Sequence, residues 1–114
     1  MRTIVAGSRT ITSSAIVYRA IAESNIPISV VLSGCAQGVD SLGEVWASDH
    51  GVPVESYPAD WDTYGQTAGL RRNSLMVSKA EALVAVWDSK SPGTRDVIAK
   101  AKRAGLRVFI YYVA

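Results

Sequence analysis

Three short segments of this 114-residue chain hold the residue types that bind phosphate groups. The first is Gly7, Ser8 and Arg9, directly after an apolar run. A glycine lets the backbone approach a ligand, a serine supplies a hydroxyl, and an arginine can donate two parallel hydrogen bonds to a phosphate. A plain turn with a surface arginine would give the same pattern, so this segment indicates a phosphate site only in combination with the other segments.

The second segment combines small residues with two carboxylates. Ser33, Gly34 and Gly38 flank a tight connection into a helix, and Asp40 and Glu44 stand four residues apart, on one face of that helix. The carboxylates are candidates for binding ribose hydroxyls or, in an enzyme, for proton transfer. Alternatively, the Asp40 charge compensates the helix dipole and the Glu44 side chain lies in solvent. The spacing matches neither the dinucleotide-binding fingerprint nor a P-loop.

The third segment opens the last expected helix. Ser91, Gly93 and Thr94 offer hydroxyls and bare backbone at a helix start, which suits a phosphate. Ordinary capping, with Ser91 as N-cap and Pro92 at the first helical position, is the alternative. Trp87 ends the preceding strand and is either a core residue or a wall on which a base stacks.

A fourth segment carries two cations near the start of a helix, where they oppose the helix dipole. They are Arg71 and Arg72, followed by Asn73. A bound anion, or an acidic side chain such as Asp60 or Asp62, would relieve this repulsion. Two aromatic side chains in the same region are candidates to cover a base or to plug the loop, namely Trp61 and Tyr64.

Apolar β-type runs alternate with helical patterns along the whole chain, which predicts the elements that position these residues. The long irregular part is residues 58–69, and the helix after it is expected to bury Leu75 and Met76. The expected strands are residues 3–6, 28–32, 53–57, 82–87 and 107–113. The first expected helix follows the capping hydroxyls of Thr12, Ser13 and Ser14 and stops at Asn25 and Pro27; the other expected helices are residues 39–50, 70–79 and 91–104.

Five strands separated by helices, without an obvious hairpin, predict a parallel sheet with right-handed crossovers. We therefore expect an α/β fold, a three-layer Rossmann-like doubly wound sheet of about five strands, in one domain over residues 1–114. Ligands bind such sheets beyond the carboxyl ends of the strands, where helix N-termini also converge. The loops after the first, second and fourth strands should then form one crevice, which Arg72 and Asn73 close from the fourth segment.

Composition excludes several classes of function. The formal net charge of +2 gives little support to a protein that binds nucleic acid by neutralising phosphates. Cys35 and His50 are the only residues of their types, so an internal disulfide and a His/Cys zinc site are excluded, and we expect neither a metal nor a cofactor. No apolar run approaches the ~20 residues of a membrane span and nothing resembles a signal peptide, so we expect a cytoplasmic protein with no membrane partner.

Taken together, the segments resemble the SLOG superfamily of Rossmann-like nucleotide-binding domains, and within it the YspA/YpsA-related group. The resemblance covers almost the entire chain in order, although each piece alone is weak. It rests on residues 7–9, 33–40, 42–44, 46–47, 59–61, 64–65, 68–69, 72–73, Met76 and 91–94.

The resemblance implies a SLOG fold that binds nucleotides or nucleotide-derived small molecules, and a homo-oligomer, since several relatives act as dimers. The relatives include DprA proteins, LOG phosphoribohydrolases and sensor domains of bacterial and phage conflict systems. The chain departs from the pattern twice: Cys35 replaces a glycine, and Val97 stands where the LOG enzymes carry a glutamate. Valine can neither exchange a proton nor hold a ribose.

Three hypotheses follow. The first is a sensor or sequestering module that binds a nucleotide derivative. The second is a LOG-like enzyme that hydrolyses the N-glycosidic bond of a nucleotide, with Asp40 or Glu44 as its carboxylate. The third is a DprA-like DNA-binding accessory protein, against which the weak net charge argues. The first is the function we expect, and the sequence leaves open whether the ligand is also turned over.

Overall fold

The computed structural model describes all residues, 1–114, and contains one five-stranded parallel sheet. The expected fold class, α/β with a doubly wound Rossmann-like sheet, is confirmed. The elements, in chain order, are β1 (Arg2–Gly7), α1 (Ser14–Ser24), β2 (Val30–Ser33), α2 (Val39–Asp49), β3 (Val54–Ser56), α3 (Trp61–Tyr64), the 3₁₀ turn η1 (Gly65–Thr67), α4 (Ala68–Lys79), β4 (Ala82–Trp87), α5 (Pro92–Arg103) and β5 (Arg107–Tyr112).

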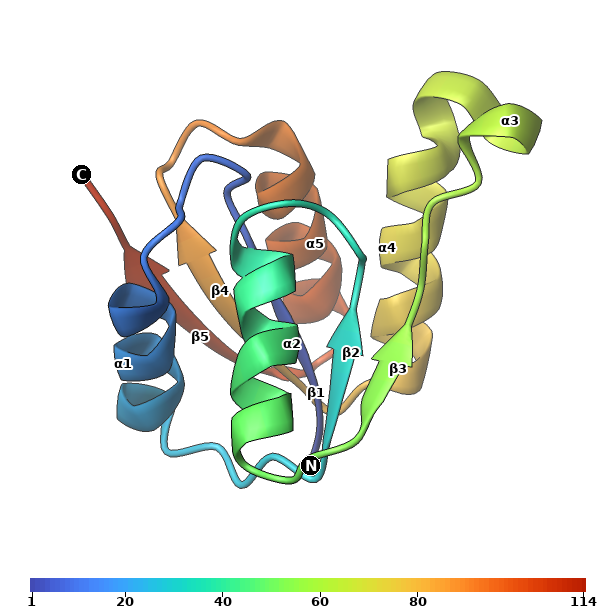
Figure 1. Cartoon of the computed structure of the whole chain (residues 1–114). Helices are drawn as coiled ribbons and strands as arrows, with labels where there is room; N and C mark the ends of the chain where they lie inside the picture. Colours follow the sequence, from blue (N-terminus) through green and yellow to red (C-terminus); the bar gives the residue numbers. More distant parts are fainter.

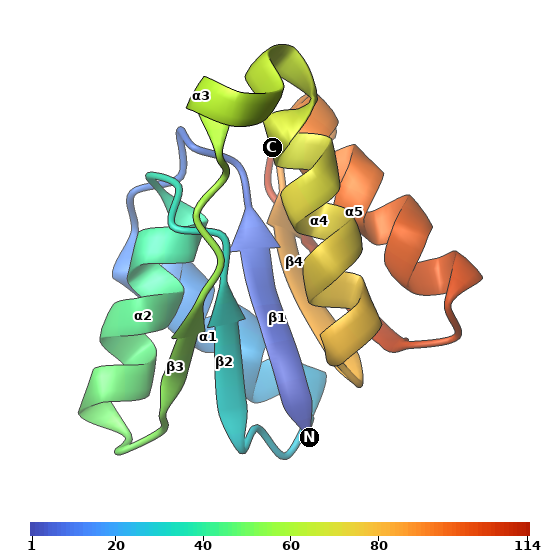
Figure 2. The same ribbon diagram turned by 90° about the vertical axis from the view of Figure 1, so that its right-hand side faces the viewer.

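The strands follow the order β3-β2-β1-β4-β5, so the chain winds outward in one direction from β1 and then in the other direction from β4. Helices α1 and α2 cover one face of the sheet, and α4 and α5 cover the other (Figure 1). The order reverses between β1 and β4, the two central strands in the view of Figure 2. Ligands of doubly wound sheets bind at such a reversal.

The period of two along each strand divides the core into two layers. In β1, Val5 packs toward α1 and α2, whereas Ile4 and Ala6 pack toward α4 and α5. The same alternation recurs in β4, whose residues 82–86 are all buried. Strands that are buried on both faces read as continuous apolar runs, which is why the sequence predicts them well.

The end of the irregular segment is where the structure departs from expectation. Residues 61–67 form the short helix α3 and the turn η1, and α4 begins at Ala68 rather than at residue 70. Met76 is buried as expected, but the prediction for Leu75 is wrong, because its side chain is 48% exposed. The two residues are neighbours on the helix, about 100° apart, so only one of them can face the sheet.

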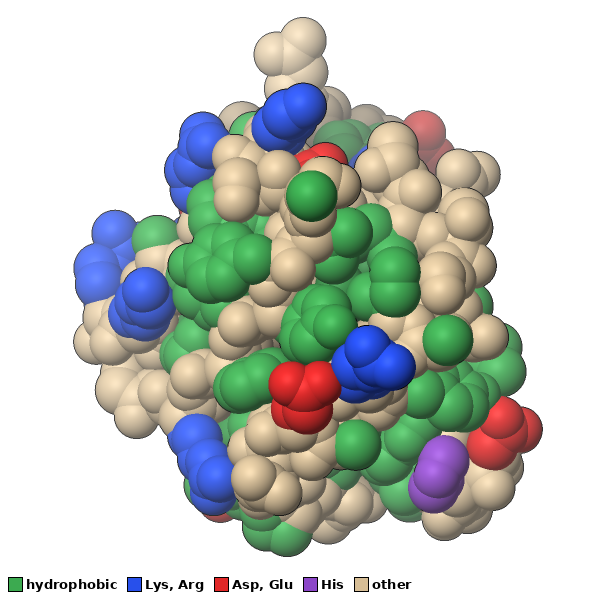
Figure 3. Space-filling model, turned by 90° about the vertical axis from the view of Figure 1, so that its left-hand side faces the viewer, with side chains coloured by type: hydrophobic (Ala, Val, Ile, Leu, Met, Phe, Trp, Pro, Cys, Tyr) green, Lys and Arg blue, Asp and Glu red, His purple; other side chains and the backbone are tan.

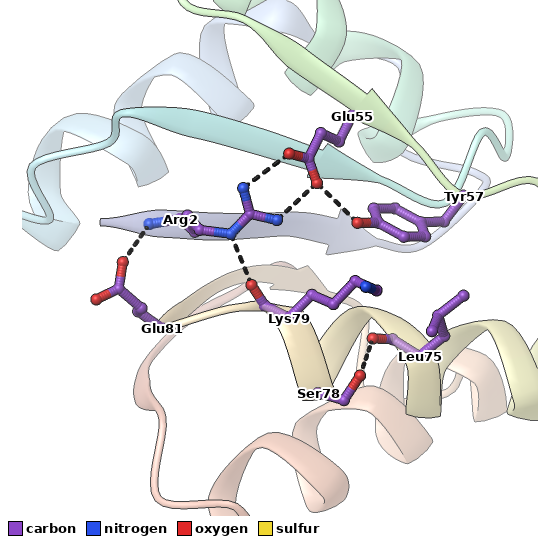
Figure 4. Close-up of polar contacts among 7 residues, drawn as sticks. All are labelled: Arg2, Glu55, Tyr57, Leu75, Ser78, Lys79 and Glu81. Carbon is purple, nitrogen blue, oxygen red and sulfur yellow. Dashed lines mark hydrogen bonds and ion pairs between the residues drawn. The ribbon is translucent and has the colours of Figure 1, made fainter.

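A polar network at the start of β1 ties the edge strand β3 and the helix α4 to the sheet centre (Figure 4). The Arg2 guanidinium donates two hydrogen bonds to the Glu55 carboxylate, at 2.7 and 2.6 Å, and its Nε donates to the Lys79 carbonyl at 2.8 Å. The Tyr57 hydroxyl donates to the same carboxylate at 2.7 Å. The hydrogen bonds from Arg2 and Tyr57 hold the pKa of Glu55 at about 2. The network fixes the point at which the chain leaves β3 for the 58–69 segment.

None of the helices combines the length and the apolar character that crossing a bilayer requires. Figure 3 shows the face that contains α1 and the end of β5. Apolar side chains gather across it, and basic side chains lie mainly along its left margin.

Candidate ligand-binding site

A cavity of about 470 Å³ opens at the carboxyl end of β1, between α2 on one side and α4 and α5 on the other. We call it the main cavity. The residues expected at the site from the sequence that line it are Gly7, Arg9, Asp40, Arg72, Asn73, Ser91, Gly93 and Thr94. The remaining lining residues are Ala6, Thr10, Ala36, Trp61, Gln66, Gly69, Leu70, Met76, Pro92 and Val97.

A smaller hollow of about 310 Å³ adjoins the main cavity, and we call it the side pocket. The loop Gly34–Gln37 and residues 58–59 form its outer walls. Four residues line both hollows: Arg9, Ala36, Trp61 and Arg72.

The N-terminus of α5 faces the main cavity with free hydrogen-bond donors. Ser91 is the N-cap residue, as expected, but its hydroxyl does not cap the helix and donates instead to the Asp88 carboxylate at 3.1 Å. Pro92 has no N–H, so the first donors are the backbone N–H groups of Gly93 and Thr94. The end of the helix is therefore electropositive and uncapped where it meets the cavity.

Asp88 organises the loop between β4 and α5. Its carboxylate accepts hydrogen bonds from the backbone N–H groups of Lys90 and Ser91, at 2.8 and 2.9 Å. These backbone hydrogen bonds lower the pKa of Asp88 to about 2. The Asp88 N–H donates to the Ser8 hydroxyl at 3.0 Å, which joins the loops after β1 and β4. Ser8 is fully buried and does not line either hollow.

The charge of Asp88 should stabilise the fold above about pH 4 and lose that effect toward pH 2. The reason is that the folded-state pKa of about 2 lies below the ordinary value of 3.8, so the unfolded chain takes up a proton first as the pH falls. Asp88→Asn keeps the acceptor oxygen and removes the charge. The urea midpoints of the two proteins should therefore differ most at neutral pH and converge near pH 2. A constant difference across that range would contradict this role.

Two arginines stand at the boundary of the two hollows. Arg9 is exposed and forms no hydrogen bond or ion pair within the protein. Arg72 is half-buried: its Nη1 donates to the Gly34 carbonyl and its Nε donates to the Asn73 amide oxygen at 3.0 Å, which leaves Nη2 free. Burial lowers the pKa of Arg72. The positive charge of Arg9 lowers this pKa further, whereas the Asp40 carboxylate raises it. Neither Asp60 nor Asp62 pairs with an arginine.

Asp40 is the acidic group of the main cavity and is only 5% exposed. Its Oδ2 accepts a hydrogen bond from the Ala36 N–H at 3.3 Å. Burial raises the pKa of Asp40, although this hydrogen bond and the Arg72 charge oppose the shift. A carboxyl group with a raised pKa in a cavity can accept a hydrogen bond from a sugar hydroxyl or deliver a proton.

Ser33 and Glu44 pair with each other and do not line the main cavity. The Ser33 hydroxyl donates to the Glu44 carboxylate at 2.5 Å and accepts from the Cys35 N–H at 3.1 Å. Gly38 precedes α2 with φ of +76°, and a Cβ there would lie 2.5 Å from the Ser8 carbonyl oxygen. These three residues shape the loop around the site, and the sequence alone does not distinguish this task from ligand contact.

Trp87 and Asn73 lie at the edges of the site. The Trp87 indole donates to the Ser91 carbonyl at 3.1 Å and does not line the main cavity. Its ring lies under the Arg95 guanidinium, 5.6 Å from the ring centroid. The Asn73 amide lines the cavity and donates to the Gly93 carbonyl at 3.2 Å, so it also joins α4 to α5.

Val97 is 1% exposed and forms part of the apolar wall of the main cavity, together with Met76. Asp96, one residue earlier, does not line the cavity; its carboxylate pairs with Lys100 at 3.0 Å and accepts a hydrogen bond from the Asn73 amide at 3.1 Å. The Val97 side chain therefore gives the cavity an apolar surface. No three His, Cys, Asp or Glu side chains are grouped closely enough to hold a metal ion.

The sequence does not predict some of the lining residues, because they belong to the 58–69 segment. Gln66 comes from η1, which the sequence does not predict, and Gly69 comes from the first turn of α4, which begins two residues before the expected helix. The sequence indicates Trp61 as a candidate to cover a base, and the Trp61 side chain lines both hollows with half of its surface exposed. Its neighbour Tyr64 lines neither hollow and stacks under Arg71.

Comparison with known proteins identifies the family and the fold. The chain is 33% identical to the Gene 61 protein of Mycobacterium phage D29, over 94% of this chain and 93% of that protein. The fold is similar to that of DNA processing protein A (DprA) from Streptococcus pneumoniae, with a TM-score of 0.75 at 17% identity, over 96% of this chain and 49% of that one. This chain thus spans about half the length of DprA, and the likeness concerns the fold alone. The family model of the YspA, cpYpsA-related SLOG family (YAcAr) matches residues 1–64, and the chain belongs to this family.

Proposed function

We propose that the protein binds a nucleotide or nucleotide-derived small molecule in the main cavity and acts as a sensor or sequestering module. The observation that carries this proposal is the convergence of unpaired donors on one cavity at the strand-order reversal. Arg9, the free Nη2 of Arg72 and the uncapped N-terminus of α5 all face it. Phosphate is the chemical group that such a set of donors recognises.

The other surfaces of the main cavity suit the remainder of a nucleotide. Met76, Val97 and Leu70 provide apolar contact for a base, and Trp61 at the rim can stack on it. Asp40 lines the same cavity, and its carboxylate oxygens can accept hydrogen bonds from ribose hydroxyls. A volume of about 470 Å³ lies in the range of small-molecule sites, and such sites combine an apolar lining with a few polar groups. Membership of a SLOG family supports the same class of ligand.

Thermal denaturation with a panel of nucleoside mono- and diphosphates, cyclic nucleotides and ADP-ribose tests this proposal. A ligand at about 100 times its Kd stabilises a protein by about 2.7 kcal/mol, which for a chain of this size raises the melting temperature by roughly 10 °C. At least one member of the panel should give such a shift. A panel without any effect would count against nucleotide binding.

A second candidate function is hydrolysis of a nucleotide N-glycosidic bond, and the position of Asp40 favours it. A carboxyl group with a raised pKa inside the cavity can protonate the departing base while a water oxygen bonds to the ribose C1′. We expect Asp40→Asn to reduce release of free base from a nucleoside monophosphate by about 10²–10⁴-fold. Glu44→Gln is the matched control, because Glu44 does not line the cavity. Intact nucleotide after long incubation of the unmodified protein would exclude this activity.

We also propose that the protein forms a homo-oligomer in the cytoplasm. Two features support self-association: β5 is an open edge of the sheet, and Tyr112 at its end is 63% exposed. Edge strands present unpaired backbone groups that a second copy can pair with. The apolar face in Figure 3 contains the end of this strand.

A further inference from the structure

A simple mononucleotide would occupy the main cavity and leave the side pocket empty. It adjoins the main cavity along a wall formed by Arg9, Ala36, Trp61 and Arg72, so a single molecule can occupy both hollows. The two volumes, about 470 and 310 Å³, are each large enough for a ring with its substituents. The ligand class inferred from the two hollows rests on the proposed function.

The wall between the hollows carries more positive than negative charge. Arg9 has no partner in the protein, and Arg72 keeps one of its terminal nitrogens free. The two guanidinium groups are close enough for Arg9 to lower the pKa of Arg72. Asp40, the carboxyl group whose charge acts on Arg72, is buried and forms no ion pair with either arginine. A group with at least two negative charges at this wall would neutralise the pair.

The side pocket itself suits a neutral polar group. Apart from the four residues that it shares with the main cavity, its lining is uncharged and mostly small: Gly34, Cys35, Gln37, Pro58 and Ala59. No carboxylate lines it, so a cationic group would find no partner there. The main cavity has a more apolar surface, which includes Met76 and Val97. The two hollows therefore differ in chemistry as the two ends of an asymmetric ligand would.

We infer that the ligand is a nucleoside diphosphate that carries a hydroxyl-rich group on its second phosphate. The nucleoside lies in the main cavity, the diphosphate bridges Arg9 and Arg72, and the hydroxyl-rich group, such as a sugar, lies in the side pocket. Arg72 is held in place for this contact by its bonds to Gly34 and Asn73.

Calorimetric titration with matched series of probes tests this inference. Each series has one base and consists of the 5′-monophosphate, the 5′-diphosphate and the diphosphate-glucose, in adenosine, guanosine and uridine forms, with ADP-ribose as an additional probe. In at least one series the diphosphate sugar should bind about tenfold or more tightly than the diphosphate, which corresponds to about 1.4 kcal/mol. Ala59→Trp fills the side pocket and should remove this gain, with the affinity for the monophosphate unchanged.

Two further variants control for the added side chain and for a folding defect. Ala22→Trp adds the same side chain at an exposed position of α1, away from both hollows, and should keep the gain. Gln37→Ala is a milder change in the side pocket and should reduce the gain even if Ala59→Trp impairs folding. Two results would overturn the inference and leave nucleotide binding intact. One is that diphosphate sugars bind no more tightly than diphosphates; the other is that the side-pocket variants keep the full gain in affinity of the unmodified protein. Failure of every probe to bind would overturn both.

Discussion

Replacement of Arg9 by alanine should weaken ligand binding about 10- to 100-fold and leave the melting temperature of the free protein unchanged. The binding loss follows because a charge-assisted hydrogen bond contributes about 1.5–3 kcal/mol, and each 1.4 kcal/mol is a factor of ten in Kd. The stability should not change because Arg9 is exposed and forms no bond within the protein. Titration with the ligand identified in the thermal panel measures the affinity, and thermal denaturation of the ligand-free variant measures its melting temperature.

Arg19→Ala is the matched control for this experiment. Arg19 is also exposed and unpaired, but it lies on α1 and lines neither hollow. Both variants lose one positive charge, so a general electrostatic effect would weaken binding equally in the two proteins. Equal affinities of the Arg9 and Arg19 variants would remove Arg9 from the site.

Gly7→Ala should be the most destabilising small substitution in the chain, by about 3 kcal/mol or more. A Cβ at this position would overlap the Val86 carbonyl oxygen of β4 and lie 2.7 Å from the Val39 side chain of α2. Neither neighbour can move freely, because one belongs to the sheet backbone and the other to a fully buried side chain. The melting temperature should fall by more than about 10 °C in differential scanning calorimetry.

Gly93→Ala provides the comparison, since a Cβ there meets no atom within 4 Å. It lies in the first turn of α5 at the same cavity, so it tests whether any added methyl group near the site destabilises the protein. We expect a change of less than about 0.5 kcal/mol. Similar losses for the two glycine variants would show that the tight packing of β1 against β4 and α2 is not the cause.

The architecture could be predicted from the sequence because its signals are local and strong. The apolar run at residues 82–86 predicts a strand covered on both faces, and Ser13 and Asn25 begin and end α1 where the sequence indicates. The helical parts of residues 58–69 could not be predicted. They are short, their aromatic side chains are about half exposed, and Asp60 supplies the only side-chain cap of α3. Such segments take their form from what they pack against.

The candidate site was predictable in position but less so in detail. Parallel topology brings the loops after β1, β2 and β4 together, so Arg9, Asp40 and Thr94 reach one cavity as the sequence predicts. Polar type and spacing do not reveal which partner a side chain will choose. The Ser33 hydroxyl bonds to Glu44 and the Ser8 hydroxyl to the Asp88 N–H, so both stabilise loops, and only the folded structure distinguishes such residues from those that remain free.

The central claim is that the main cavity holds a phosphate-bearing nucleotide ligand, and mass spectrometry tests it most directly. The protein, its Arg9→Ala variant and its Arg19→Ala variant are each incubated with a bacterial small-molecule extract, separated by gel filtration and denatured. The molecules that are released are then identified. We predict a phosphorylated nucleotide derivative with the unmodified protein and with Arg19→Ala, and little or none with Arg9→Ala. No retained phosphorylated molecule, or equal retention by all three proteins, would contradict the account.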